Sequence, residues 1–415
     1  MKKDYIQSIK TGLLQNSEYL KLLFGQLLAH FGDSIMQIAL IAWIVKYLDV
    51  AGKEIASVFF FFLVPQFVLS PFTGAIADKF NRKTILVISN IYRALIVAFI
   101  AYLIKFGNFD SQNFHYYMVL IDMLAFLLGL GYTFFYSAKM PAMTNVVNSS
   151  QLKLANTLNS GFINFINIFG VAVAGIAILK TGLLWLVIGT ALIYFLASVL
   201  FAFMKFRYPQ SFNTDKNVFA DIKTALCYLN GHRIVLQVIL LSISISLIIG
   251  IFINELNTLT IDYYKLGVGG VTKFRVMLGI GILLGMVVTV LAARVKKIYP
   301  IWVIGFGTLA AVLLTAKFCT SVLMAWFWLI PFGIANVIIM VMIDTFFQKS
   351  VPDRVRGKIF GLQLTLNTFA FMLGAYTIMR ADIHPIYMYY ILGRFALIIA
   401  VGILIGNLFK REMRS

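Results

Sequence analysis

The chain has 415 residues, of which 61% are hydrophobic and 12% are charged, and its formal net charge is +19. A soluble domain normally carries about 25% charged residues, so this composition excludes an ordinary soluble protein. In a membrane protein the distribution of positive charge is more informative than its sum.

Apolar runs follow one another along the chain, and each is long enough to cross about 30 Å of hydrocarbon as a helix. They lie at 20–46, 55–77, 84–104, 117–138, 157–179, 182–204, 234–258, 272–293, 299–318, 322–345, 359–379 and 386–408. We therefore predict an all-α polytopic membrane protein with 12 transmembrane helices in two six-helix bundles.

Polar stretches divide the chain around these runs. The predicted parts are an N-terminal segment at 1–19, a first bundle at 20–204, a linker at 205–233, a second bundle at 234–408 and a tail at 409–415. The first 19 residues lack the charged-then-apolar order of a removable signal peptide. If the N-terminus is cytoplasmic, segments on its side hold about three times as many Lys and Arg residues as the opposite segments. We expect both termini on the cytoplasmic side of a bacterial-type inner membrane, and no nucleic-acid partner.

Charged residues inside the spans are candidates for a transport site, because a charge at the bilayer centre costs at least about 2.5–3.5 kcal/mol. Asp33 and Arg93 fall at similar depths in the first and third spans, so they can pair. One interpretation is a site for a proton or a cationic substrate, and the other is a static salt bridge. Glu255 and Arg275 lie near the outer ends of the seventh and eighth spans, where they would form an outer gate or reach interfacial water.

The fifth span has a polar stripe whose members recur at helical spacing. It comprises Asn156, Ser160, Asn164 and Asn167. Polar groups that face lipid are costly, so the stripe should face protein or a cavity. Gln363 and Asn367 occupy the corresponding stripe of the eleventh span, and Gln37 of the first span is a further candidate. Hydrogen bonding between helices is the alternative to a cavity lining.

The stretch between the second and third runs, residues 74–83, reads Gly-Ala-Ile-Ala-Asp-Lys-Phe-Asn-Arg-Lys. It resembles the signature loop of the major facilitator superfamily, with the pattern G-x-x-x-D-[RK]-x-G-R-[KR]. The chain departs from the pattern once, because Asn81 stands where the family usually has Gly. Asn is the next best residue for a left-handed turn, so we expect Asn81 to adopt one.

The resemblance implies that this loop gates transport. Asp78 would cap the N-terminus of the eleventh helix, where free backbone N–H groups attract an anion. Arg82 would orient Asp78. The gating set is Gly74, Asp78, Arg82, Lys83, Arg356 and Gly357.

The two halves resemble each other at an offset of about 204 residues. Residues 156–170 correspond to residues 360–374, and each stretch opens a span that follows a basic loop. Two such six-helix repeats around a central cavity are the architecture that this symmetry indicates.

Three further stretches, at 90–94, 140–156 and 347–360, are similar to the macrolide-efflux and siderophore-exporter branch of the superfamily. This resemblance implies proton-coupled export of an amphipathic small molecule, either drug-like or a siderophore, by alternating access. A lysophospholipid or lipid flippase, or a solute importer of the same fold, is the alternative. The fifth span lacks the G-P-x-x-G-G motif of many antiporters, since residues 170–175 contain no proline.

An enzyme is not indicated, because the four histidines are scattered and no G-x-x-x-x-G-K-[ST] loop is present. No metal-ligand spacing occurs around the two cysteines. We expect a monomer without a cofactor, driven by a proton gradient, whose partners are a small-molecule or lipid-like substrate and membrane lipids.

Overall fold

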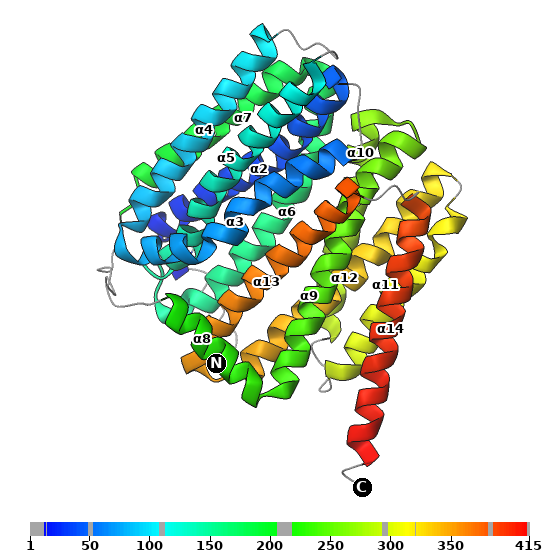
Figure 1. Ribbon diagram of the computed structural model, residues 1–415. Coiled ribbons are helices and arrows are strands. Elements are labelled where there is room, and N and C mark those ends of the chain that lie inside the picture. Colours follow the sequence, from blue (N-terminus) through cyan, green and yellow to red (C-terminus); the bar gives the residue numbers. More distant parts are fainter. Residues whose placement is uncertain are drawn as a thin grey trace. The chain divides into compact units, whose positions relative to one another are not determined.

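The protein is described by a computed structural model that is built of helices throughout its described ranges (Figure 1). These ranges are residues 12–13, 15–48, 53–107, 113–205, 218–292, 298–319, 321–380 and 385–412. The longer helices are α2 (Ser17–Leu48), α3 (Lys53–Lys79), α4 (Arg82–Phe106), α5 (Phe114–Met143), α6 (Ser149–Thr181), α7 (Leu183–Ala202), α9 (Arg233–Thr258), α10 (Gly267–Ala292), α11 (Ile298–Leu314), α12 (Val322–Ser350), α13 (Asp353–Arg380) and α14 (Pro385–Glu412).

Within the described residues, 11 helices are long and apolar enough to cross a membrane. The remaining expected span falls on α3, whose described apolar stretch, Glu54–Ser70, is shorter than the others. The all-helical polytopic fold predicted from the sequence is confirmed. The expected linker is partly helical, because α8 (Val218–Gly231) lies inside it, and residues 206–217 are outside the described part.

The chain forms two compact units. Unit 1 comprises Met1–Val50 and Phe61–Val218, and unit 2 comprises Ala51–Phe60 and Phe219–Ser415. In unit 1, α2 packs against α6 and α7, and α4 packs against α7. In unit 2, α9 packs against α13 and α11 packs against α14. The first and fifth spans are therefore neighbours in each unit, and so are the third and sixth, as an internal repeat requires.

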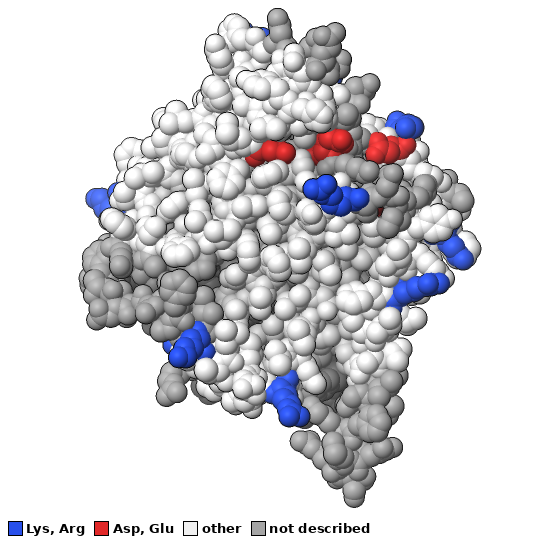
Figure 2. Space-filling view, viewed as in Figure 1, with Lys and Arg blue, Asp and Glu red and all other residues white. Residues whose placement is uncertain are grey.

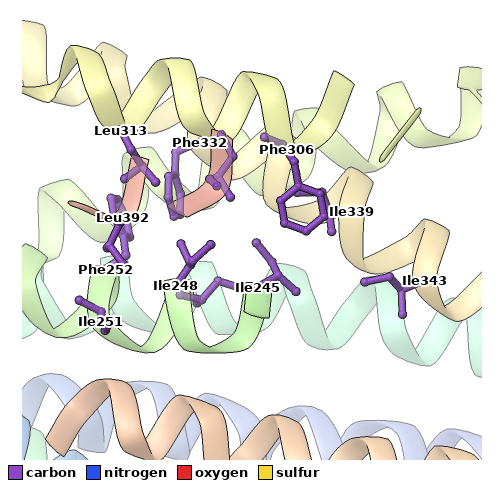
Figure 3. Packing of buried hydrophobic residues seen from close by; sticks show 14 of the residues in the cluster. Ile245, Ile248, Ile251, Phe252, Phe306, Leu313, Phe332, Ile339, Ile343 and Leu392 are labelled. Carbon is purple, nitrogen blue, oxygen red and sulfur yellow. The ribbon is translucent and has the colours of Figure 1, made fainter. Parts of the chain in front are cut away.

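The core of unit 2 is a continuous apolar cluster contributed by α9, α11, α12 and α14 (Figure 3). Phe252 of α9 stacks on Phe332 of α12, with ring centroids 3.6 Å apart, and Leu313 and Leu392 lie beside them. A separate cluster in unit 1 packs residues of α2, α4, α5 and α7 together. Each unit thus has its own core.

Apolar residues also cover much of the outside of the helices. Leu179 is 78% exposed, and many Phe, Leu and Ile side chains are more than half exposed. Figure 2 shows a face on which charged side chains are few, with the acidic ones in one band beside basic ones and most of the remaining surface uncharged. Such a surface is stable against lipid tails and unstable in water.

The fifth span approaches the first closely in both units. A Cβ atom added at Gly374 of α13 would lie 2.6 Å from the backbone nitrogen of Ile251 in α9. One added at Gly170 of α6, at the matching place in unit 1, would lie 2.7 Å from Cβ of Ser34 in α2. Small residues at these crossings let helices approach each other, as is common in membranes.

We expect Gly374→Ala to lower the stability of the protein by about 1–3 kcal/mol, because the new methyl group meets backbone that no rotamer change can move. Gly361→Ala is the matched control on the same helix, since nothing lies within 4 Å of a Cβ there. The control should leave stability unchanged or raise it, because alanine favours helices. Thermal unfolding in lipid nanodiscs measures both, and equal effects would contradict the packing.

Candidate functional site

The centre of the candidate site is an ion pair between α2 and α4 in unit 1. Nη1 of Arg93 lies 2.7 Å from Oδ1 of Asp33. The Arg93 side chain is 1% exposed and that of Asp33 is 10% exposed. The pairing predicted from the similar depths of these residues is present in the structure.

Arg93 is held by partners on three further sides. Nη2 of Arg93 donates to Oδ1 of Asn90 at 2.6 Å, one turn earlier on α4. The guanidinium carbon lies 4.5 Å from the ring centroid of Phe135 (α5) and 4.6 Å from that of Tyr194 (α7). A cation–π interaction between arginine and an aromatic face contributes about 2 kcal/mol or more of stabilisation when the contact is desolvated. Arg93 therefore connects α2, α4, α5 and α7, which favours a fixed cation over a mobile one.

The two oxygens of Asp33 differ in their surroundings. Oδ1 accepts a hydrogen bond from the Tyr194 hydroxyl at 2.7 Å in addition to the one from Arg93. Oδ2 is buried and has no hydrogen-bond partner among the described residues. Nδ1 of His30, one turn earlier on α2, lies 3.8 Å from Oδ2. Oδ2 is therefore the position at which Asp33 can accept a proton or a ligand.

A second cation reaches this group through His30. Nζ of Lys139 (α5) lies 2.7 Å from Nε2 of His30, and both side chains are buried. The Lys139 ammonium also lies 4.4 Å from the ring centroid of Tyr136. Gln26 of α2 donates to the backbone oxygen of Lys139 at 3.3 Å, which fixes this turn of α5 against α2. The buried cluster thus contains one acid, two cations and a histidine.

Sequence reasoning missed Lys139, His30 and Tyr194. The predicted span 117–138 leaves Lys139 outside the membrane, but Lys139 lies inside α5 and is 4% exposed. The available signal was the spacing of His30 and Asp33, because residues three apart lie on one face of a helix. No sequence pattern marks Tyr194 as a site residue, since a single tyrosine in an apolar run is common.

The acid and the arginine expected to gate unit 2 are not joined by an ion pair in the described part of the chain. Glu255 of α9 is 3% exposed, so it does not simply reach water, and its Oε1 has no hydrogen-bond partner among the described residues. Arg275 of α10 donates to Oδ1 of Asn257 at 3.4 Å, and its guanidinium carbon lies 5.4 Å from the Phe59 ring centroid. Arg275 therefore contacts an amide of α9, Asn257, rather than the predicted partner Glu255.

Three members of the polar stripes, Asn167, Gln363 and Asn367, form hydrogen bonds with a neighbouring helix. The Ser34 hydroxyl of α2 donates to Oδ1 of Asn167 at 3.3 Å. In unit 2, Ser242 of α9 donates to Oδ1 of Asn367 at 2.9 Å and accepts from Nε2 of Gln363 at 3.0 Å. These contacts agree with the interhelical alternative. Asn164 and Gln37 are half-buried, and the side chains of Asn156 and Ser160 lie outside the described part.

The loop that carries the family resemblance shows a different turn from the expected one. Asn81 has φ −63°, so it does not adopt a left-handed turn, and instead its side chain caps α4 by accepting from the Lys83 backbone N–H. Arg82 donates to the Pro141 carbonyl at 3.0 Å and to Oδ1 of Asn145 at 2.7 Å. Asparagine is a favoured N-cap residue, which explains its place here.

The other expected gating contacts cannot be followed in the structure. Lys83 is half-buried. The side chains of Asp78 and Arg356 and the surroundings of Gly74 and Gly357 lie outside the described part. Among the described residues no group of His, Cys, Asp and Glu side chains is arranged to hold a metal ion.

We expect Tyr194→Phe to lower the stability of unit 1 by about 1–3 kcal/mol, because it removes a hydrogen bond to a buried carboxylate. Tyr102→Phe is the matched control, since Tyr102 of α4 is 58% exposed. Thermal unfolding in nanodiscs compares the two variants. A Tyr194→Phe melting temperature equal to that of the control would show that the bond contributes nothing.

Comparison with known proteins places this geometry in a family. Residues 22–375 match the family described as Major Facilitator Superfamily. The chain is 23% identical over 363 residues to an uncharacterized MFS-type transporter, YfiS of Bacillus subtilis strain 168, covering 85% of this chain and 84% of that one. It is 24% identical over 364 residues to BacE of the same strain, named as a candidate bacilysin exporter, covering 84% of each.

Solved structures show the same fold. A crystal structure of the nucleoside transporter NupG has a TM-score of 0.72 at 12% identity, covering 93% of this chain and 99% of that one. A crystal structure of the POT family transporter PepTSo has a TM-score of 0.72 at 12% identity, covering 96% of this chain and 99% of that one. With its membrane-spanning helices in two similar units, this chain belongs to the Major Facilitator Superfamily and is a secondary transporter rather than an enzyme.

Proposed function

We propose that this transporter exports an amphipathic small molecule in exchange for protons, by alternating access. The observation that carries the proposal is the buried Asp33 carboxylate, which has one oxygen fixed by Arg93 and Tyr194 and the other without a hydrogen-bond partner among the described residues. When a carboxylate buried among α2, α4, α5 and α7 takes up a proton, it loses its negative charge, and the electrostatic interactions among these four helices change.

Proton uptake at Asp33 would favour a conformational change because it removes the only described acid beside two buried cations. In low dielectric the repulsion between Arg93 and Lys139 is then no longer offset by a negative charge. Because of this repulsion, the free energy falls when the helices that carry these residues move apart or admit water. Since a proton shifts the balance between two states only by its differential affinity for them, this coupling is what a proton-driven carrier needs.

Export is the favoured direction because the curated relatives include candidate exporters. The aromatic side chains beside the charges support an amphipathic substrate, since Tyr132, Tyr136 and Phe135 surround the Arg93 and Lys139 cations. A drug-like compound or a siderophore meets this description. The excess of Lys and Arg in the segments on the side of the termini supports termini in the cytoplasm of a bacterial inner membrane.

A lipid or lysophospholipid flippase of the same fold is the competing function, because the exposed apolar surface is equally compatible with it. Reconstituted vesicles with an internal pH-sensitive dye separate the two. Bacilysin, ethidium and a tricarboxylate siderophore are the soluble probes, and a fluorescent lysophospholipid is the lipid probe. Solute-evoked proton flux supports the exporter, whereas lysophospholipid movement that ignores the pH gradient supports the flippase.

Asp33→Asn should abolish proton-coupled transport while the protein still folds, because an amide cannot take up the proton. We expect gradient-driven transport to fall by about a hundredfold or more. Initial rates in vesicles between about pH 6 and pH 8 measure the effect. Wild-type rates in this variant across that range would remove Asp33 from the coupling mechanism.

Asp78→Asn should slow turnover more than it weakens substrate binding, because the proposed role of Asp78 is to hold one conformation through a helix N-terminus. A contact worth about 1–2 kcal/mol corresponds to a change of about 5- to 30-fold in rate. Transport rate and equilibrium probe binding are measured on the same preparation, with Lys105→Gln, at an exposed position of α4 outside the gating set, as the control. Unchanged turnover in Asp78→Asn would exclude the gating role.

A further inference from the structure

The pair formed by His30 and Lys139 is not explained by the ion pair at Asp33 alone. Burying a lysine in a membrane is costly unless an anion compensates it, and the one described acid nearby is already bound to Arg93. Lys139 instead uses a neutral imidazole as its partner, at 2.7 Å. A short contact between two nitrogens that both exchange protons can pass a proton from one to the other.

With Lys139 charged, the hydrogen bond between its Nζ and Nε2 of His30 assigns the positions of the protons. A charged lysine can only donate, so Nε2 of His30 must accept. The imidazole proton is then on Nδ1, which faces Oδ2 of Asp33 across 3.8 Å. That oxygen has no hydrogen-bond partner among the described residues. Lys139, His30 and Asp33 therefore form a line in which each donor faces an acceptor.

We propose that Lys139 and His30 form a proton relay that delivers a proton to Asp33 or withdraws one from it, and this inference rests on the proposed proton coupling. In the delivering direction, a proton leaves Nζ of Lys139 and binds Nε2 of His30. The proton on Nδ1 of His30 leaves and binds Oδ2 of Asp33. His30 ends as the other neutral tautomer, and Asp33 ends as a carboxylic acid. Lys139 ends as a neutral amine and becomes a cation again when it takes up a proton from water, which restores the repulsion between it and Arg93.

The 3.8 Å gap gives the relay a conformational dependence. A hydrogen bond between N–H and a carboxylate oxygen needs about 2.7–3.2 Å, so transfer requires the His30 ring to approach Asp33. His30 and Asp33 are both on α2, so rotation of their side chains closes this gap, whereas movement of α5 relative to α2 makes or breaks the contact between Lys139 and His30. The relay is thus incomplete in the described state and completes in another.

The position of Lys139 indicates the side of the membrane with which the relay exchanges protons. Lys139 lies four residues before the end of α5 at Met143, which is about 6 Å along the helix axis. Arg82 contacts Pro141 and Asn145 at the same end. This is the end that the charge bias places in the cytoplasm, so Lys139 exchanges protons with that side. During proton-driven export the line would carry protons from Asp33, deeper in the bundle, to Lys139.

Among the residues that the structure describes, no other titratable group near the line replaces these three. The remaining ones facing it are Arg93 on α4, Tyr132 and Tyr136 on α5 and Tyr194 on α7. Arginine and tyrosine keep their protons at neutral pH. The helix α6 reaches this part of α2 through Asn167, which does not titrate.

The decisive variant is Lys139→Arg, because arginine preserves the charge and the donor but does not release its proton. In pH-gradient-driven vesicles the relay predicts that Lys139→Arg slows transport of the active probe (bacilysin, ethidium or the siderophore) by about tenfold or more. Lys105→Arg, at an exposed site on α4, is the matched control and should match wild type. Gradient-driven transport that Lys139→Arg leaves unchanged would overturn the relay and leave the proposed function intact.

A measurement on wild-type protein covers the case in which the variant fails to fold. The chain has four histidines, so ¹⁵N-histidine NMR in nanodiscs, with His30→Gln to assign the signal, reports the His30 protonation state directly. The relay predicts a neutral imidazole whose Nε2 accepts a hydrogen bond. A doubly protonated His30 at neutral pH would overturn it, since neither nitrogen could accept a proton. Wild-type protein that moves no probe in response to the gradient would contradict the proposed function, and the relay with it.

Discussion

The compensation of buried charge in unit 1 is the constraint on which the rest of the site depends. One carboxylate, Asp33, lies among Arg93, Lys139 and His30 in an interior where an unpaired ion is several kcal/mol less stable than a paired one. Satisfying these groups fixes the mutual positions of α2, α4, α5 and α7. The same constraint makes the proton occupancy of Asp33 a structural variable, because a single proton changes which helices attract each other.

The two units use similar packing and different chemistry. In each, a serine of the first span hydrogen-bonds the asparagine of the fifth, through Ser34 and Asn167 in one and Ser242 and Asn367 in the other. Glycines at matching places allow the same close approach. The described residues of unit 2 contain no counterpart of the charge cluster of unit 1, and the buried acid Glu255 lies instead near amides and the Tyr389 ring. The two halves of the repeat share the same helix packing and differ in their buried charges.

The sequence predicts well the features that depend on patterns extending over many residues, such as the positions of the helices. Apolar runs located the helices, and equal depth paired Asp33 with Arg93. It predicts poorly what depends on rotamers and on helix ends. Asn81 caps a helix instead of taking a left-handed turn, because both roles suit asparagine and only the backbone decides between them.

Lys139 shows the same limit at the site itself. The run ended near 138, but α5 continues to Met143, and a difference of a few residues turned a buried cation into an apparent loop charge. Tyr194 and Asn90 could not be found from sequence, since each becomes functional only through a neighbour on the Asp33–Arg93 pair. Glu255 and Arg275 share a depth as Asp33 and Arg93 do, yet Asn257 contacts the arginine instead, because depth does not fix the rotation of a helix.

The central claim is that Asp33 takes up a proton inside the bundle, and infrared difference spectroscopy tests it most directly. Reconstituted protein is brought from alkaline to acidic buffer, and the carbonyl stretch of protonated carboxyl groups is followed in wild type and in Asp33→Asn. The account predicts a band typical of a buried carboxylic acid that appears on acidification in wild type and is missing from the variant. Identical difference spectra for the two proteins would contradict it, because the Asp33–Arg93 pair would then be a static salt bridge.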